Sequence, residues 1–257
     1  MATTAAAALA KPRLQFLRLR VPIQEQLRIE EALFRVDKRR NWFIYNEEKT
    51  PVTIVMGISG KPEQLLQLDA VKRDGIPVLK RFSGGGTVIV DHNTVFTTFI
   101  CNVDAFPYVK PFPREIMAWS STFFSPFFNR VCDNGLTFAL REDDYVFGDR
   151  KFGGNAQSIS KDRWLHHTSF LWDFDPKNME YLTNPARQPA YRQQRSHLQF
   201  LCTLKEVLKK EAASRDKFAG ELRSELATQF VVEDVDVASL ESLLSQEHRR
   251  ATKFLTL

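Results

Sequence analysis

Hydrophobic positions along the 257-residue chain change their spacing several times, and each change predicts a structural element. Apolar residues at helical spacing over residues 22–39 predict a first helix. A buried strand over 51–57 follows, and an apolar stripe over 62–75 predicts a second helix that starts at a proline and stops at a glycine. Residues 76–79 read as a short strand, and the β-branched run over 88–101 predicts a hairpin that turns at its middle.

The central part of the chain alternates between a long helical pattern and strands. Apolar spacing predicts a helix over 114–132, bent near Pro126. A strand over 145–147 then leads through a tight turn into a second hairpin, formed by residues 151–160 and 163–174. Alternation along its later strand predicts one core-facing set of side chains: Trp164, His166, Phe170 and Trp172.

After Tyr191 the pattern becomes helical over residues 198–230 and 238–255, joined by a β-rich stretch over 230–237. Strands and helices are therefore interspersed along the whole chain. We expect an α+β fold, with mixed, mostly antiparallel sheets and helices that flank them.

Composition narrows the class of protein. Hydrophobic residues make up 43% of the chain and charged residues 26%, which is typical of a globular protein and excludes wholesale disorder. No apolar run approaches the roughly 18 residues that a membrane-spanning helix needs. Cys101, Cys132 and Cys202 are odd in number and far apart, which excludes a disulfide framework and a CxxC metal site. We expect a reduced, intracellular chain.

The formal charge of +5 and the pI near 9.1 are compatible with an anionic ligand or partner. The basic residues are scattered, and no RRM, zinc-finger or KH pattern occurs, so we expect no nucleic-acid binding. Residues 1–13 are rich in Ala and Thr and lack acids. That composition suits an organelle transit peptide, and a frayed N-terminus is the alternative.

Three consecutive glycines, Gly84–Gly86, stand between two predicted strands, where each glycine costs backbone entropy. Arg81 and Ser83 precede them. A backbone without side chains lets N–H groups approach an anion closely, and an arginine adds a planar charged fork. The pattern indicates a phosphate or carboxylate site, and a β-bulge or turn is the alternative.

A second cationic segment, KFGGNAQ over residues 151–157, places Lys151 beside two glycines at the start of a strand. Taken alone, Lys151 could be a solvated turn residue. The Walker spacing and the GxGxxG fingerprint are both absent, so a phosphate site here is of another type. Two glycine-flanked cations that each lead into a hairpin suggest convergence on one anionic ligand.

Four elements follow one another along the chain: RFSGGGTV over residues 81–88 with Asp91, then Asp144, KFGGNAQ over 151–157 and the histidine pair at 166–167. Together they resemble elements of the lipoate–protein ligase family. Those elements are RRxSGGGxV, ND, KxxGxAQ and HH, and their order and distances agree. The resemblance covers about residues 20–200. The biotin-ligase signatures GRGRxxR and KWPND are absent, which favours lipoate or another medium-chain acid as substrate.

The resemblance implies a fold shared with biotin ligases and class II aminoacyl-tRNA synthetases. It further implies a flexible tail over residues 1–13, a catalytic domain over 14–200 and a helical extension of that domain over 201–257. We expect this chain to lack the accessory domain that full ligases of the family carry, so the resemblance also implies a separate accessory subunit as a partner. The other partners implied are lipoyl acceptor domains of 2-oxoacid dehydrogenases or the glycine cleavage H protein, with no membrane partner. The compartment implied is the mitochondrion, with the cytoplasm or a plastid as alternatives.

The activity implied is ATP-dependent conversion of lipoate to lipoyl-AMP, followed by transfer to an acceptor lysine. Lys151 would be the catalytic residue between acyl carboxylate and α-phosphate, Asp144 would orient Lys151 or adenine, and Mg²⁺ would neutralise the polyphosphate. Apolar side chains at Val55, Val88 and Phe152 would wall the acyl tail. The implied ATP- and lipoate-binding residues are Arg81, Ser83, Gly84, Gly85, Gly86, Thr87, Asp91, Asp144, Gly154, Asn155, Ala156 and His166.

This chain departs from the family pattern at four positions, which are Lys80, Val90, Gly153 and Thr168. Two other functions therefore stay open. One is an ATP-independent octanoyl or lipoyl transferase that works through a cysteine thioester, for which Cys202 is the plausible nucleophile. The other is a non-catalytic scaffold that binds a lipoyl domain or a nucleotide.

Overall fold

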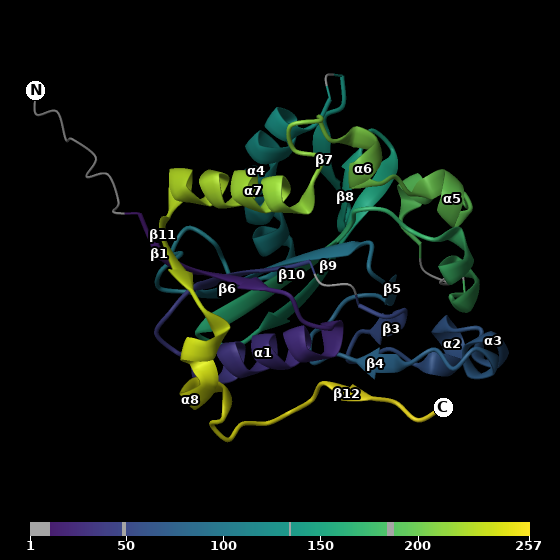
Figure 1. Ribbon diagram of the computed structural model, residues 1–257, viewed down its shortest axis with the longest axis horizontal. Coiled ribbons are helices and arrows are strands. Elements are labelled where there is room, and N and C mark those ends of the chain that lie inside the picture. Colours follow the sequence, from purple (N-terminus) through teal and green to yellow (C-terminus); the bar gives the residue numbers. More distant parts are fainter. Residues whose placement is uncertain (1–10, 48–49, 134, 184–187) are drawn as a thin grey trace, which may run out of the picture.

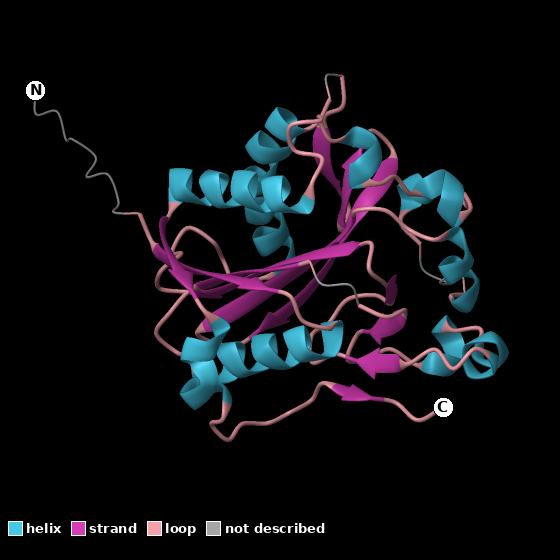
Figure 2. Cartoon of the chain, viewed as in Figure 1, coloured by secondary structure: helices cyan, strands magenta, loops and turns pink. Residues whose placement is uncertain are grey.

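The computed structural model describes residues 11–47, 50–133, 135–183 and 188–257. These residues form two sheets with helices around them (Figures 1 and 2). The large sheet has the order β11-β1-β2-β6-β10-β9-β8-β7. Its strands are β1 (Arg13–Leu19), β2 (Trp42–Asn46), β6 (Thr94–Asn102), β7 (Phe138–Arg141), β8 (Asp144–Phe147), β9 (Arg150–Ile159), β10 (Arg163–Leu171) and β11 (Val231–Val235).

The small sheet has the order β12-β4-β3-β5. Its strands are β3 (Thr53–Met56), β4 (Val78–Lys80), β5 (Val88–Val90) and β12 (Lys253–Phe254). The α-helices are α1 (Ile23–Val36), α2 (Pro62–Leu65), α3 (Leu68–Arg73), α4 (Pro113–Val131), α5 (His197–Phe200), α6 (Leu204–Val207), α7 (Arg215–Gln229) and α8 (Glu241–Leu244). Three 3₁₀ helices, η1 (Pro176–Tyr181), η2 (Ala190–Arg192) and η3 (Val237–Leu240), complete the described elements.

Helices α4 and α7 cover one face of the large sheet, and α1 with the small sheet lies on the other face (Figure 1). The core under α4 is unusually aromatic. Phe128 makes edge contacts with Phe152 and Phe170, at ring-centroid distances of 5.0 and 5.4 Å. Each buried phenylalanine contributes about 1.5–3 kcal/mol of transfer free energy, so this cluster stabilises the packing of α4 on the sheet.

The sequence predicted the class of fold and several elements correctly. The sheet is mixed and mostly antiparallel, with parallel pairs among β11, β1 and β2. Helix α4 and the β9–β10 hairpin lie where the periodicity placed them. The predicted core-facing set on β10 and just beyond it is buried, as expected: Trp164, His166, Phe170 and Trp172.

The predicted hairpin over residues 88–101 is wrong. Strand β5 pairs with β3 in the small sheet, whereas β6 pairs with β2 and β10 in the large one. The chain crosses between the sheets at a turn that the Asp91 carboxylate stabilises, because it accepts hydrogen bonds from the Asn93 amide (2.8 Å) and the Asn178 side chain (2.9 Å). The β-branched run predicts extended backbone but says nothing of its partner.

The chain ends also differ from expectation. The prediction of helix over 238–255 is wrong beyond Leu244, because the chain extends there and β12 joins the small sheet. Buried Glu31 accepts the backbone amides of Ala251 and Thr252, at 2.8 and 3.0 Å, which holds this stretch against α1. At the other end, β1 was not predicted, and residues 1–10 of the expected tail lie outside the described residues.

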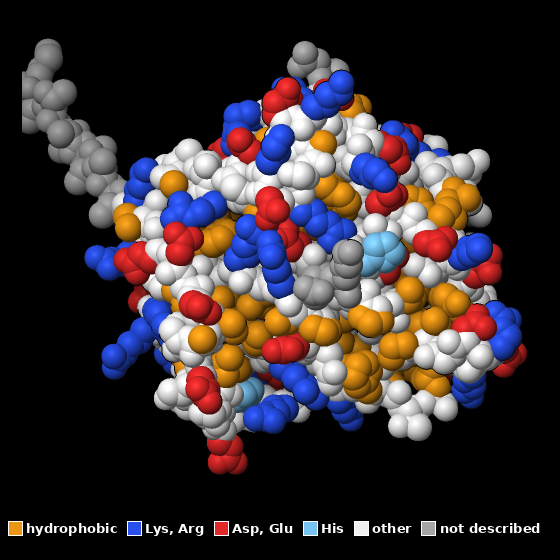
Figure 3. Space-filling model, in the orientation of Figure 1, with side chains coloured by type: hydrophobic (Ala, Val, Ile, Leu, Met, Phe, Trp, Pro, Cys, Tyr) orange, Lys and Arg blue, Asp and Glu red, His pale blue; other side chains and the backbone are white. Residues whose placement is uncertain are grey.

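Within the described ranges, no helix combines the length and apolar character needed to cross a membrane. Figure 3 shows acidic and basic side chains interspersed over one face of the molecule, around a band of apolar side chains. The scattered basic residues of the sequence therefore gather into no single stripe on that face.

Candidate active site

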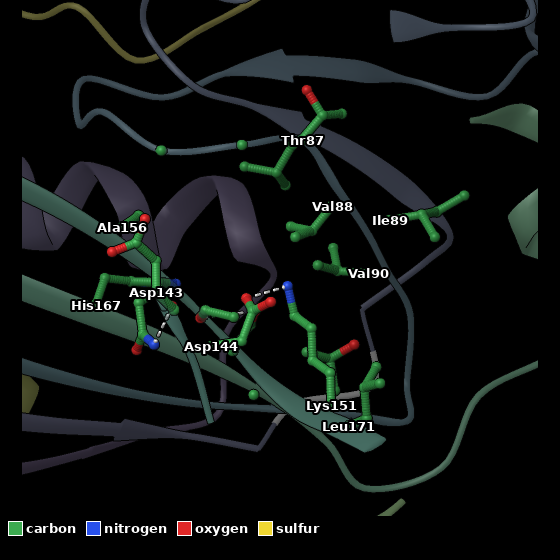
Figure 4. A pocket seen from close by; sticks show the side chains of 18 of the residues that line it. Thr87, Val88, Ile89, Val90, Asp143, Asp144, Lys151, Ala156, His167 and Leu171 are labelled. Atoms are coloured by element: carbon green, nitrogen blue, oxygen red, sulfur yellow. Dashed lines mark hydrogen bonds and ion pairs between the residues drawn. The ribbon is translucent and has the colours of Figure 1, made fainter. Parts of the chain in front are cut away.

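A cavity of about 700 Å³ is lined by residues of both sheets, of α1 and of the segment after Pro189 (Figure 4). One part of it is apolar. Val55 of β3, Val88 and Val90 of β5, Phe96 of β6 and Ile23 of α1 all line it, and they also form one hydrophobic cluster. This part fits an apolar chain, because a lining of side chains without polar atoms favours a ligand that needs no hydrogen bonds.

Val55 and Val88 therefore line the cavity as predicted, whereas Phe152 does not. The Phe152 ring is fully buried on the other face of the large sheet, stacked between Phe147 and Phe170 at centroid distances of 4.3 and 5.8 Å. Successive side chains of a strand point to opposite faces. Since Lys151 of β9 lines the cavity, its neighbour Phe152 points into the core.

The polar part of the cavity contains Lys151 and Asp144, which the β8–β9 hairpin brings together. The Lys151 Nζ lies 2.7 Å from Asp144 Oδ1 (Figure 4). Asp144 is buried, and the Lys151 side chain is 26% exposed. On its other oxygen, Asp144 accepts a 2.8 Å hydrogen bond from the Tyr191 hydroxyl. Asp144 thus has the contact that its predicted role in orienting Lys151 requires.

The glycine loop borders the same cavity, and Arg81 shapes it. Arg81 is buried, and its Nη2 donates to the carbonyls of Gly84 and Gly86, both at 2.8 Å, while its Nε donates to Ser83. Burial lowers the pKa of Arg81 to about 10, so the guanidinium stays charged at neutral pH. In this structure those Arg81 donors hold the loop itself.

The glycines of the loop are required by close packing. Gly85 has a φ of +101°, which a side chain disfavours. A Cβ on Gly57 would lie 2.2 Å from the Gly85 carbonyl oxygen, so the turn after β3 and the loop touch backbone to backbone. The Gly84 amide donates to the Gln157 carbonyl of β9 at 2.8 Å, which fastens the loop to the large sheet.

Most other predicted binding residues meet at the cavity. Its lining includes Thr87, Gly154, Asn155 and Ala156. The Thr87 hydroxyl has no hydrogen-bond partner among the described residues. Asp91 and Ser83, in contrast, are not part of the lining: Asp91 stabilises the turn between the sheets, and Ser83 accepts from Arg81.

His166 also lies away from the cavity, and its neighbour His167 lines it instead. His166 is fully buried, within 3.1 Å of both the Tyr145 hydroxyl and the Gln157 amide. Burial, followed by the charge of His167, lowers the pKa of His166 to about 3, so the ring is neutral at pH 7. The alternation that placed His166 with Trp164 in the core would have pointed to His167.

A buried polar network behind His167 was not predicted. The His167 Nδ1 lies 3.0 Å from Glu30 Oε2 and 3.0 Å from the Thr98 hydroxyl. Gln26 donates to Glu30 at 2.6 Å and accepts from Asn46 at 2.7 Å. Helix α1 thus buries polar side chains under the cavity, and they are satisfied by one another.

Arg192 and His197 also line the cavity and were missed. Burial lowers the pKa of His197, and the charges of Arg192 and Lys151 lower it further, so its ring is neutral at pH 7 and lies near two cations. No local pattern marks residues 189–201 as part of a site. Among the described residues, no group of three or more His, Cys, Asp and Glu side chains is placed to hold a metal ion.

The three cysteines are buried, and none is part of the cavity lining. Burial raises the pKa of the Cys202 thiol to about 11 and that of Cys132 to about 12, and it raises the pKa of Cys101 as well. The Cys202 Sγ lies 3.5 Å from the Arg150 carbonyl oxygen. A thiol with a raised pKa carries little thiolate at neutral pH, which disfavours it as a nucleophile.

With this geometry in place, the comparison with known families is decisive: residues 22–227 match the lipoyl protein ligase A/B catalytic domain. The chain belongs to that family. An inactive lipoate–protein ligase 2 of Plasmodium falciparum is 30% identical over 234 residues, which cover 70% of this chain and 60% of that protein. A lipoate-protein ligase A of Blochmanniella floridana is 27% identical over 170 residues, which cover 62% of this chain and 45% of that protein. The chain thus spans about half the length of these relatives.

Solved structures agree on the fold. A lipoate-protein ligase A bound with ATP superimposes with a TM-score of 0.71 at 16% identity, over 91% of this chain and 93% of the other. A bi-partite lipoate protein ligase of Thermoplasma acidophilum, from a structural analysis of this ligase and its E2 lipoyl domain, has a TM-score of 0.68 at 16% identity. The match covers 91% of this chain and 90% of the other. The α+β fold and the family predicted from the sequence are therefore both confirmed.

Proposed function

We propose that this chain joins lipoate to ATP, forming lipoyl-AMP, and transfers the lipoyl group to a lysine of an acceptor domain. One observation carries the proposal: a single cavity combines an apolar lining with the Asp144-held ammonium of Lys151 and a glycine loop. The ATP-bound ligase of the same fold supports ATP as the second substrate.

In the first step, a carboxylate oxygen of lipoate attacks the α-phosphorus of ATP, and the bond to the β-phosphate oxygen breaks to release pyrophosphate. In the second, the acceptor amine attacks the acyl carbon, loses a proton and expels AMP. Both transition states concentrate negative charge on carboxylate and phosphate oxygens. A preorganised cation lowers such barriers, and Lys151 would supply it while Asp144 fixes its direction.

Magnesium would accompany the phosphates of ATP. Mg²⁺ is usually held by one or two carboxylates together with substrate phosphates and water. Both oxygens of Asp144 are engaged by Lys151 and Tyr191, so the exposed Asp143 of the cavity lining is the carboxylate that would hold the ion. When bound, the ion would neutralise charge on the leaving pyrophosphate.

Two alternatives define the test. A thioester transferase needs a reactive cysteine, which the burial of all three thiols disfavours. A binding scaffold is the other, and the relative named as inactive gives it weight.

Lipoate-dependent exchange of pyrophosphate into ATP separates these functions. Exchange supports the ligase. Acyl transfer from octanoyl-carrier protein without ATP supports the transferase, and binding of a lipoyl domain with neither activity supports the scaffold.

We extend the proposal to the identity of the acceptor, to a separate accessory subunit and to the compartment. Lipoyl domains of 2-oxoacid dehydrogenases and the H protein are the acceptors we propose, and the archaeal ligase described with its E2 lipoyl domain supports that class. Assays with each acceptor, with and without a candidate accessory subunit, test the first two points. Localisation of a tagged chain tests the mitochondrial assignment.

A further inference from the structure

The segment over residues 189–202 holds Lys151 from two sides. The Tyr191 hydroxyl donates to Asp144 Oδ2 at 2.8 Å, and Asp144 Oδ1 in turn lies 2.7 Å from the Lys151 Nζ. The Cys202 amide donates to the Lys151 backbone carbonyl at 2.9 Å. One segment, distant in sequence from the β8–β9 hairpin, therefore fixes both the backbone of Lys151 and the carboxylate that pairs with its side chain.

Asp144 is buried, and a buried carboxylate needs its oxygens satisfied. Each oxygen has one of these partners, Lys151 or Tyr191. Burial raises the pKa of the Tyr191 phenol, and the nearby Asp144 charge raises it further, so the hydroxyl remains a donor throughout the physiological range. Of the two partners of Asp144, Lys151 is the one that lines the cavity, and its side chain is partly exposed there.

Asp144 also lies near a second cation. Arg192 lines the cavity with Lys151, and the negative charge of Asp144 raises the pKa of Arg192 against the lowering effect of burial. An Asp144 side chain free to rotate could pair with Arg192 in place of Lys151. Lys151 would then lose its fixed direction, because the attraction of Asp144 would no longer offset the repulsion between the Lys151 ammonium and the Arg192 guanidinium.

We propose that Tyr191 is a positioning residue that acts through Asp144 to direct Lys151 at the reacting oxygens. This inference rests on the proposed ligase function. When an anionic substrate draws the Lys151 ammonium away, the hydrogen bond from Tyr191 keeps Asp144 in place. The ammonium then moves between the Asp144 carboxylate and the substrate in one fixed direction. Tyr191 itself touches neither substrate.

The test is Tyr191→Phe, which removes the hydroxyl alone. We expect kcat for pyrophosphate exchange to fall about 10-fold, as for loss of a hydrogen bond to a charged group, with KM for ATP and lipoate changed less than about 2-fold. In an Asp144→Asn background, the same substitution should add less than about 2-fold, because both act through one contact. The matched control is Tyr181→Phe, which removes a 3.0 Å hydrogen bond to exposed Asp74 outside the cavity.

A second measurement needs no activity. Trace acetylation with acetic anhydride, read by mass spectrometry, reports the reactivity of the Lys151 amine. We expect Lys151 to label roughly 3-fold faster in Tyr191→Phe, because its ion pair is loosened, with Lys205, paired to Asp173 at the surface, as the internal reference. Unchanged labelling would overturn the inference. If the wild-type protein shows no pyrophosphate exchange but Lys151 still labels faster in Tyr191→Phe, the ligase function is refuted and the role of Tyr191 stands.

Discussion

Lys151 and Asp144 meet at 2.7 Å although they are not opposite each other in the β8–β9 ladder. Asp144 faces Gly154, and a register shift at Tyr145 and Val146 brings Lys151 opposite Val146. A Cβ on Gly154 would lie 3.6 Å from the Lys151 Nζ, which is ordinary van der Waals contact, so an alanine would fit there. The register shift therefore explains how the ion pair forms.

Replacing Lys151 with alanine is expected to lower lipoate-dependent pyrophosphate exchange at least about 100-fold, since removal of one preorganised donor to a developing charge costs that much. The free energy of unfolding should fall by about 1–3 kcal/mol, because Oδ1 of the buried Asp144 loses its partner while Oδ2 keeps the bond from Tyr191. Exchange kinetics and urea unfolding measure the two effects. Exposed Lys161→Ala is the control, and near-normal exchange by Lys151→Ala would contradict the assigned role.

The substitution Gly57→Ala should destabilise the protein by about 1–3 kcal/mol, because its Cβ would overlap the Gly85 carbonyl oxygen. Gly220→Ala is the matched control. It lies in α7 with nothing within 4 Å of an added Cβ, and should stabilise by about 0.5–1 kcal/mol through helix propensity. Urea unfolding measures both. Equal effects would show that contact with the glycine loop does not limit residue 57.

Cys202→Ala should leave acyl transfer within about 2-fold of the wild type, because the thiol is buried and its raised pKa of about 11 leaves it protonated. Cys202→Ser should behave likewise at temperatures well below unfolding. Transfer to a lipoyl domain is followed by mass spectrometry. Loss of transfer in both variants, each shown to be folded, would establish the thioester route instead.

Stability should fall as the pH drops below about 6.5, the value for His166 in the unfolded chain. Folding lowers the pKa of His166 to about 3 by burial, so the unfolded state binds the proton first and gains from acid. The contribution of neutral His166 to the free energy of unfolding is fully present above pH 6.5 and is lost progressively toward pH 3. At pH 4.5 the loss is on the order of 2 kcal/mol.

Urea unfolding between pH 4 and 8 measures this loss. In His166→Gln the part of the slope that belongs to His166 should disappear, whatever the variant's absolute stability. A variant with the wild-type slope would show that other groups carry the acid sensitivity.

Local sequence patterns were sufficient to predict much of the secondary structure. Helix α4, the β9–β10 hairpin and the glycine loop follow from residues close together in the chain, because helical and strand periodicity and glycine conformation are local properties. The motifs around Arg81, Lys151 and His167, taken together, were sufficient to identify the family, and the match over residues 22–227 confirms it. The residue assignments within the site stay predictions that the variants above test.

Only the tertiary structure decided which strands pair and which faces meet. Strands β5 and β6 separate into different sheets, Arg81 turns its donors to the loop that follows it, and Tyr191 reaches Asp144 from a segment with no motif. The physical reason is that pairing and burial minimise the free energy of the whole chain, so distant segments compete for the same partners. Periodicity records that a residue is buried or extended, and packing alone selects what it touches.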